Sequence, residues 1–302
     1  MMAFKECITD RDNSTQWQIG KIKITRIVEL VVSGNNAFVL PDAENDLCLS
    51  LDWMKPHFMN DDGDLILSVH ALIIDTGEKR IMVDTCIGND KQLAVPDWDK
   101  MQTGFLSDLE DAGYPAESID TVLCTHLHVD HVGWNTMLVD DKWVPTFSNA
   151  RYLFAKEEWN HWNAHEDEIE IGPVMQQSVR PVVEAGLMDL VDCEHQVCAG
   201  VNLIPTPGHT PGHVSVHISS EGKEAVITGD FVHHPVQMSR PHWCSSADDD
   251  QSKGLQTRKE MFSKYVDSDV LIIGTHFPTP TAGYIRHLSD DENYWLDINI
   301  GK

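Results

Sequence analysis

The sequence has few positively charged residues and no long apolar run. Lysine and arginine number 22 against 48 acidic residues, which leaves a formal net charge of −26. A surface of this sign repels phosphate groups, so nucleic acid and anionic membranes are not expected as partners. No stretch is long and apolar enough to cross a bilayer, and residues 1–17 contain no apolar core of signal-peptide length. We therefore expect a cytoplasmic protein.

Closely spaced pairs of cysteines are also absent from the sequence. The seven cysteines include no Cys-x-x-Cys spacing, and their number is odd. A disulfide framework is therefore not expected, and reduced, buried thiols are the default. Cys124 lies in an apolar run just before a cluster of histidines, where we expect it to be a small core residue rather than a nucleophile.

The composition is otherwise that of a large globular protein, with 41% apolar residues and nine tryptophans. A chain of this length buries roughly three quarters of its unfolded surface, as one large domain or two smaller ones. We expect a single domain over residues 1–302, in which residues 1–64 form an N-terminal strand and an arm. The aromatic side chains of residues 49–62 are expected to be exposed, either as a homodimer contact, which we prefer, or as a pocket rim.

Short apolar runs dominate the pattern and predict many strands, at residues 21–32, 65–76, 80–85, 120–126, 150–155, 201–206, 214–219, 224–230 and 269–276. Helical patterns fall between groups of strands, at residues 103–114, 156–165, 173–186 and 248–266. Pro181 should kink the third helix. The acidic stretch 165–170 is expected to be a solvated face. Packed sheets with helices outside them are the natural architecture for this pattern.

One short segment concentrates candidate metal ligands. Residues 125–131 read Thr-His-Leu-His-Val-Asp-His and follow an apolar run. Alternate residues of an extended chain point the same way, so His126 and His128 can bind one metal ion together. Asp130 and His131 lie past the turn and can face a second ion. Four candidate ligands within six residues indicate a metal site.

Further ligand types follow other apolar runs. The run at 201–206 leads to His209 and His213, the run at 224–229 to Asp230, and the run at 269–275 to His276. Because ligands commonly collect at strand ends, we expect these residues to complete the site. The spacing alone does not decide between His209 and His213.

Taken together, the segments His-Leu-His-Val-Asp-His, Gly-His-Thr-Pro-Gly-His, Thr-Gly-Asp and Gly-Thr-His resemble the metallo-β-lactamase-fold hydrolases, over residues 65–280. The resemblance implies an α+β fold, a four-layered αββα sandwich. It also implies two zinc ions per chain, for which manganese, cobalt or iron could substitute. The implied ligands are His126, His128 and His209 for the first ion, Asp130, His131 and His276 for the second, and Asp230 for both. The resemblance gives Asp84 and His213 supporting roles behind the ligands.

Within this superfamily the sequence is most similar to N-acyl-homoserine lactonases and the neighbouring methyl-parathion-hydrolase branch. True β-lactamases lack the last histidine of the first motif, so drug hydrolysis is not expected. The resemblance implies a dinuclear zinc hydrolase that opens a lactone or cleaves an ester of a small, fairly apolar molecule by attack of a metal-bridging hydroxide. A lactonase of this kind would serve quorum quenching.

Two alternatives stay open. One is a phosphotriesterase, or a thioesterase of the hydroxyacylglutathione-hydrolase kind, that uses the same metals. The other, from a different class, is a catalytically idle binding protein on this fold, against which the intact ligand set argues.

The sequence departs from the lactonase pattern at one position. Many lactonases have a tyrosine three residues after the bridging aspartate, and His233 occupies that position here. A histidine can still donate a hydrogen bond to a developing oxyanion, so we expect His233 to be catalytic together with Asp130 and Asp230. Four further side chains are expected to border the substrate pocket: Trp159, Trp162, His234 and Trp243.

Overall fold

The computed structural model describes residues 4–8, 15–165, 172–288 and 293–300. The chain divides into two compact units. Unit 1 comprises Met1–Ala3, Arg11–Glu29 and Val69–Cys193. Unit 2 comprises Phe4–Asp10, Leu30–Ser68 and Glu194–Lys302. Residues 166–170, expected to be part of a solvated acidic face, lie outside the described residues.

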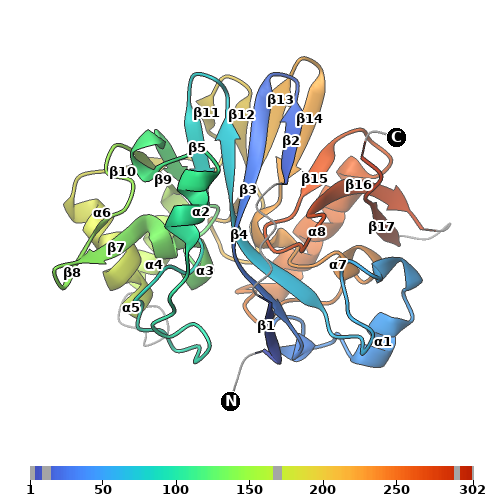
Figure 1. Ribbon diagram of the computed structural model, residues 1–302. Helices are drawn as coiled ribbons and strands as arrows, with labels where there is room; N and C mark the ends of the chain where they lie inside the picture. Colours follow the sequence, from blue (N-terminus) through green and yellow to red (C-terminus); the bar gives the residue numbers. More distant parts are fainter. Residues whose placement is uncertain (1–3, 9–14, 166–171, 289–292, 301–302) are drawn as a thin grey trace. The chain divides into compact units, whose positions relative to one another are not determined.

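Eight strands form the first sheet, in the order β1-β3-β4-β5-β6-β9-β10 with β2 paired to β3 (Figure 1). Their bounds are β1 (Glu6–Ile8), β2 (Gln16–Ile19), β3 (Ile22–Ser33), β4 (Ile66–Asp75), β5 (Arg80–Val83), β6 (Thr121–Leu123), β9 (Arg151–Ala155) and β10 (Met188–Val191). The pairs β5–β6, β6–β9 and β9–β10 are parallel. Parallel neighbours end at the same edge of a sheet, so the loops that leave them gather there.

The helices of unit 1 are short. They are α2 (Phe105–Asp111), α3 (Val129–Val132), α4 (Lys156–Ala164), α5 (Gly172–Val174) and α6 (Arg180–Glu184), with 3-10 turns η3 (Ala116–Ser118) and η4 (Gly133–Asn135). A π-helical turn, η5 (Met175–Val179), separates α5 from α6, and Pro181 lies in the first turn of α6. The expected break in this helix is therefore present, and it precedes Pro181 because the first turn of a helix tolerates the missing N–H group. A hairpin of β7 (Thr136–Val139) and β8 (Lys142–Pro145) follows η4.

Seven strands form the sheet of unit 2, in sequence order: β11 (Gln196–Cys198), β12 (Val201–Pro205), β13 (Val214–Ser220), β14 (Lys223–Ile227), β15 (Leu271–Ile273), β16 (Ala282–His287) and β17 (Tyr294–Asp297). Among the described strands of this sheet, only β14 and β15 pair in parallel. A parallel pair needs a crossover, which here contains η6 (Gly229–Phe231), α7 (Val236–Ser239) and α8 (Gln251–Tyr265). The N-terminal part of this unit adds η1 (Asn36–Phe38), α1 (Asn45–Leu49) and η2 (Asp52–Met54).

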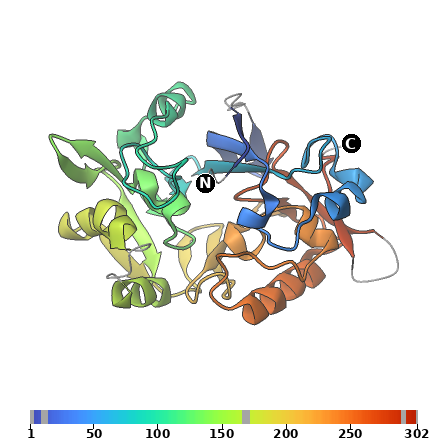
Figure 2. The ribbon, with the colours of Figure 1, turned by 90° about the horizontal axis from the view of Figure 1, so that it is seen from below.

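The long helix α8 packs on this sheet (Figure 2). Its first turn is capped by the Asp250 side chain, which accepts a hydrogen bond from the Lys253 amide. Met261 and Phe262 of α8 share one apolar cluster with residues of β14 to β17. Phe58 belongs to the same cluster and Trp53 packs against it half-buried, so these two aromatic side chains of segment 49–62, expected to be exposed, contribute to the core of unit 2.

The strands that lead to candidate ligands share one feature. β6, β14 and β15 end at Leu123, Ile227 and Ile273, each three residues before a candidate ligand. The observed strands therefore end earlier than the expected ones, which ran to the end of each apolar run. The last residues of each run form the loop that carries the ligand. The other expected strands and the helices at 103–114, 156–165 and 248–266 are confirmed with small shifts at their ends. None of the helices formed by the described residues is long and apolar enough to span a membrane.

Candidate metal centre

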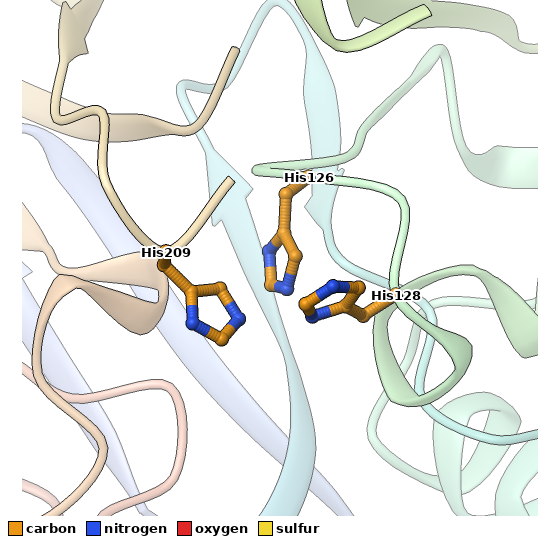
Figure 3. Close-up of side chains that lie close together, drawn as sticks. All are labelled: His126, His128 and His209. Carbon is orange, nitrogen blue, oxygen red and sulfur yellow. The ribbon is translucent and has the colours of Figure 1, made fainter. Parts of the chain in front are cut away.

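In unit 1, the loop after β6 brings three imidazole rings together. His126 and His131 are buried and His128 is half-buried. The rings of His126 and His128 (Figure 3) stand nearly perpendicular with their centroids 4.6 Å apart. The centroid of the His131 ring lies 4.0 Å from that of His126. Asp130 joins this group, because its Oδ1 lies 3.7 Å from His131 Nε2. The cluster expected from the sequence therefore exists within this unit.

Asp84 holds both ends of this loop. Its Oδ1 accepts a hydrogen bond from the Thr125 amide at 2.7 Å, and its Oδ2 accepts one from His131 Nδ1 at 2.9 Å. A carboxylate only accepts, so the proton of His131 is on Nδ1 and its Nε2 keeps a lone pair. This is the arrangement in which a histidine binds a metal through Nε2 while a carboxylate orients its ring.

A second buried carboxylate, that of Glu29, hydrogen-bonds to residues next to the same loop. Glu29 accepts hydrogen bonds from the amides of Ile87 and Gly88 and from Trp134 Nε1. Burial raises the pKa of Glu29, although these hydrogen bonds oppose the change. Gly133, which follows the histidine loop, packs so closely here that an added Cβ would lie 1.8 Å from the Ile87 carbonyl oxygen. The position therefore requires glycine.

In unit 2, three imidazoles converge on one carboxylate oxygen. The Nε2 atoms of His209, His233 and His276 lie 3.6, 3.4 and 3.2 Å from Asp230 Oδ2. All four side chains are buried. His209, Asp230 and His276 leave different strands of the sheet, so the topology of unit 2 brings together residues that are far apart in the sequence.

The outer nitrogens of two of these rings contact oxygen acceptors. His209 Nδ1 lies 2.8 Å from Asp248 Oδ1, and His276 Nδ1 lies 3.0 Å from the Ser68 carbonyl oxygen. Both rings therefore carry their proton on Nδ1 and turn the Nε2 lone pair toward Asp230. Lone pairs and a carboxylate oxygen repel one another at such distances unless a cation lies among them. Nitrogen and oxygen donors of this kind suit zinc and related divalent ions.

His213 plays a different part from His209. Its Nε2 accepts a hydrogen bond from the Asp230 amide at 2.7 Å, so its proton is on Nδ1, which donates to Thr206 Oγ1 at 2.8 Å. With Nε2 used in this way, His213 supports the backbone of Asp230. His209 instead presents Nε2 to the Asp230 carboxylate. The sequence spacing left these two histidines undecided, and their hydrogen bonds separate them.

The neighbours His233 and His234 are both buried but face different groups. Burial lowers the pKa of each to about 3. The His234 ring bonds to backbone groups on both sides, donating from Nε2 to the Phe58 carbonyl and accepting at Nδ1 from the Val236 amide. His233 turns Nε2 toward Asp230, and its Nδ1 has no hydrogen-bond partner among the described residues.

The tryptophans expected at the pocket occupy different surroundings. Trp162 is buried, with its ring 5.3 Å from that of His128, and its Nε1 donates to the buried Glu158 carboxylate. Trp159 is half-buried. Trp243 belongs to the apolar cluster of unit 2. The role of these side chains and of His234 in substrate binding stays a prediction.

Sequence reasoning did not identify Asp248 as part of the site. It belongs to three consecutive aspartates that suggested only a helix N-terminus, and Asp250 does cap α8. The side chain of Asp248 is buried instead, and its carboxylate orients His209. Burial alone would raise the pKa of Asp248, but the hydrogen bond from His209 and nearby positive charge hold it below its usual value.

Residues 66–276 match the sequence model of the metallo-beta-lactamase superfamily. Among similar solved structures, the hydrolase AbOPH of the beta lactamase superfamily is 25% identical, with a TM-score of 0.77 over 95% of this chain and 98% of its own. AidC, a dizinc quorum-quenching lactonase in complex with a product, is 21% identical, with a TM-score of 0.75 over 94% and 96%. A probable metal-dependent hydrolase from Staphylococcus aureus is 20% identical, with a TM-score of 0.70 over 94% and 100%. No curated protein matches the chain. These similarities confirm the expected α+β sandwich fold.

Proposed function

Because the chain belongs to the metallo-β-lactamase superfamily, we propose that it is a dinuclear zinc hydrolase that opens a lactone or cleaves an ester of a small, fairly apolar molecule. The similar solved structures include a hydrolase and a probable metal-dependent hydrolase, which supports hydrolysis as the reaction class. The observation that carries the proposal is the group of buried histidines around Asp230, with Nε2 atoms 3.2 to 3.6 Å from one carboxylate oxygen.

The proposed metal ligands are the residues that the superfamily's motifs select in this sequence. Four of them lie in the loop after β6, and the others follow β12, β14 and β15. The proposed sets are His126, His128 and His209 for the first ion, Asp130, His131 and His276 for the second, and Asp230 for both. Asp84 and Asp248 support this assignment, because each carboxylate fixes the tautomer of a ligand histidine.

Divalent ions bound by these residues would supply Lewis-acid chemistry, acidifying water and stabilising negative charge on a carbonyl or phosphoryl oxygen. The chain itself contributes orientation and hydrogen bonds. Its buried ligand residues are held by Asp84, Asp248, the Ser68 carbonyl and His213, so the donor atoms are positioned before substrate binds. Such preorganisation means that little reorganisation is needed during the reaction.

His233 is proposed to donate a hydrogen bond to the oxygen that gains negative charge. Its Nε2 lies 3.4 Å from Asp230 Oδ2, so the ring faces the proposed metal-bridging residue. The substitution of histidine for the tyrosine of many lactonases favours a second candidate function, a phosphotriesterase on the same site. A lactone or ester remains first, because a similar structure is a dizinc lactonase. We retain a cytoplasmic homodimer as part of the proposal, and light scattering during size-exclusion chromatography tests the dimer.

A four-substrate comparison tests the proposed function. Zinc-loaded protein is assayed with an N-acyl-homoserine lactone, an aryl ester, a thioester and a phosphotriester, and the metal content of the same sample is measured. We expect about two ions per chain and the highest kcat/KM for the lactone, with activity lost on chelation and restored by zinc. A clear preference for the phosphotriester would replace the first candidate by the second. Turnover of none of the four by fully loaded protein would favour the binding-protein alternative.

A further inference from the structure

Helix α8 carries an arginine that is completely enclosed by unit 2. The Arg258 side chain is 0% exposed, which is rare for arginine. Its Nε donates to the Phe231 carbonyl oxygen at 2.9 Å, and its Nη1 donates to the Pro241 carbonyl oxygen at 2.8 Å. Its Nη2 lies 3.6 Å from Asp248 Oδ2. One guanidinium group therefore contacts three separate points of the chain between β14 and α8.

Two of these points adjoin proposed metal ligands. Phe231 follows Asp230 directly in the chain, so a hydrogen bond to its carbonyl restrains the backbone that carries the Asp230 carboxylate. Asp248 accepts the hydrogen bond from His209 Nδ1 through its other oxygen. Arg258 is thus linked to one ligand through the backbone and to another through a carboxylate.

The charge of Arg258 explains how Asp248 can be buried at this place. An enclosed carboxylate is costly unless it is paired with a positive group and hydrogen-bonded. Asp248 has hydrogen bonds from His209 and from the Ser245 amide, and Arg258 supplies the nearby positive charge. A guanidinium group is always charged and directs several donors in one plane, which a lysine ammonium cannot reproduce.

We propose that Arg258 is a positioning residue of the metal centre. It holds the Asp248 carboxylate and the Phe231 carbonyl in place, and through them it fixes His209 and Asp230 for metal binding. This inference rests on the proposed function, because it takes His209 and Asp230 as metal ligands. It assigns a function at the metal centre to a residue of α8, far from every ligand motif in the sequence.

Zinc affinity is the measurement that tests this role. Protein stripped of metal is titrated with zinc in competition with a chromophoric chelator, for wild type, Asp248→Asn, Arg258→Met, Arg258→Lys and the Asp248→Asn/Arg258→Met double variant. Loss of an orienting partner typically weakens metal binding by about 10- to 100-fold. We expect losses of this size for Asp248→Asn and Arg258→Met, and partial recovery in Arg258→Lys, which restores the charge without the planar donors.

The double variant distinguishes positioning from a general effect on the fold. If Arg258 acts largely through Asp248, the two losses are not additive, and the double variant should bind zinc only a few-fold more weakly than either single variant. Phe262→Leu is the matched control, because Phe262 is buried on the same helix within the apolar cluster. It should lower the melting temperature and leave zinc affinity unchanged.

Several results would overturn the inference. These are wild-type zinc affinity in Arg258→Met, full additivity in the double variant, or an equal loss of affinity in Phe262→Leu. If Arg258→Met does not fold, the Arg258→Lys and Asp248→Asn variants and their combination apply the same criteria. A wild-type protein that binds no zinc would overturn both proposals, whereas one that binds zinc but hydrolyses none of the four substrates would overturn only the proposed function.

Discussion

Replacing Lys91 by methionine should change how the stability of the protein depends on pH. Lys91 lies in the loop after β5 and is 1% exposed. Its Nζ lies 2.6 Å from Thr136 Oγ1 and 3.3 Å from the Gln177 carbonyl oxygen, and it lies 3.7 Å from the centroid of the Trp143 ring. Burial lowers the pKa of Lys91 from 10.5 to about 6, although nearby carboxylates oppose the change.

The direction of the effect follows from where the proton binds. Between the folded pKa of about 6 and the unfolded pKa of 10.5, only the unfolded chain holds the extra proton on Lys91. Raising the pH through this window therefore favours the folded state, and lowering it toward pH 6 removes that stability. From about pH 7 to about pH 9, the free energy of unfolding should rise by roughly 2.7 kcal/mol more in wild type than in Lys91→Met.

Urea unfolding of the two proteins at several pH values in this window measures the difference. Protonation of the metal ligands affects both proteins equally, so it cancels when one is compared with the other. Lys142→Met, which removes an exposed lysine from β8 in the neighbouring hairpin, controls for the loss of one positive charge from an acidic chain. A difference between wild type and Lys91→Met that is independent of pH would refute the reasoning. It would show that the surrounding oxygens and the Trp143 ring keep the ammonium charged.

Three further predictions concern the site and its support. Asp230→Ala should lower the occupancy of both metal positions, measured by elemental analysis, because Asp230 is the proposed bridging ligand; retention of two ions per chain would show that the bridge is misassigned. His233→Ala should keep both metals and the fold while lowering turnover by about 100-fold, the scale for loss of one oxyanion donor, whereas His234→Ala should change turnover little. Wild-type turnover in His233→Ala would exclude the role. Gly133→Ala should destabilise unit 1 by about 3 kcal/mol or more in urea unfolding, because its Cβ would meet the Ile87 carbonyl oxygen; unchanged stability would contradict the packing.

Much of the fold could be predicted from the sequence, because strand and helix patterns are local. The apolar alternation around β4 and β13 and the acidic start and basic end of the α8 segment are visible within a few residues. The hairpin of β7 and β8 was not predicted. The burial of Phe58 also could not be read from its neighbours, because its partners in the apolar cluster lie on distant strands and helices.

The sequence by itself determined the candidate ligands, apart from the choice between His209 and His213, because His126, His128, Asp130 and His131 lie within six residues and the remaining ligand types each follow an apolar run. The resemblance implied Asp84 and His213 as supporting residues, but only the tertiary structure identified the other groups that hold those ligands in place. Asp248 contacts His209 across 39 positions, and Glu29 contacts the Ile87 amide across 58. A buried polar group must find hydrogen-bond partners, but the path of the folded chain determines which ones come within reach. That path cannot be read from a local pattern in the sequence.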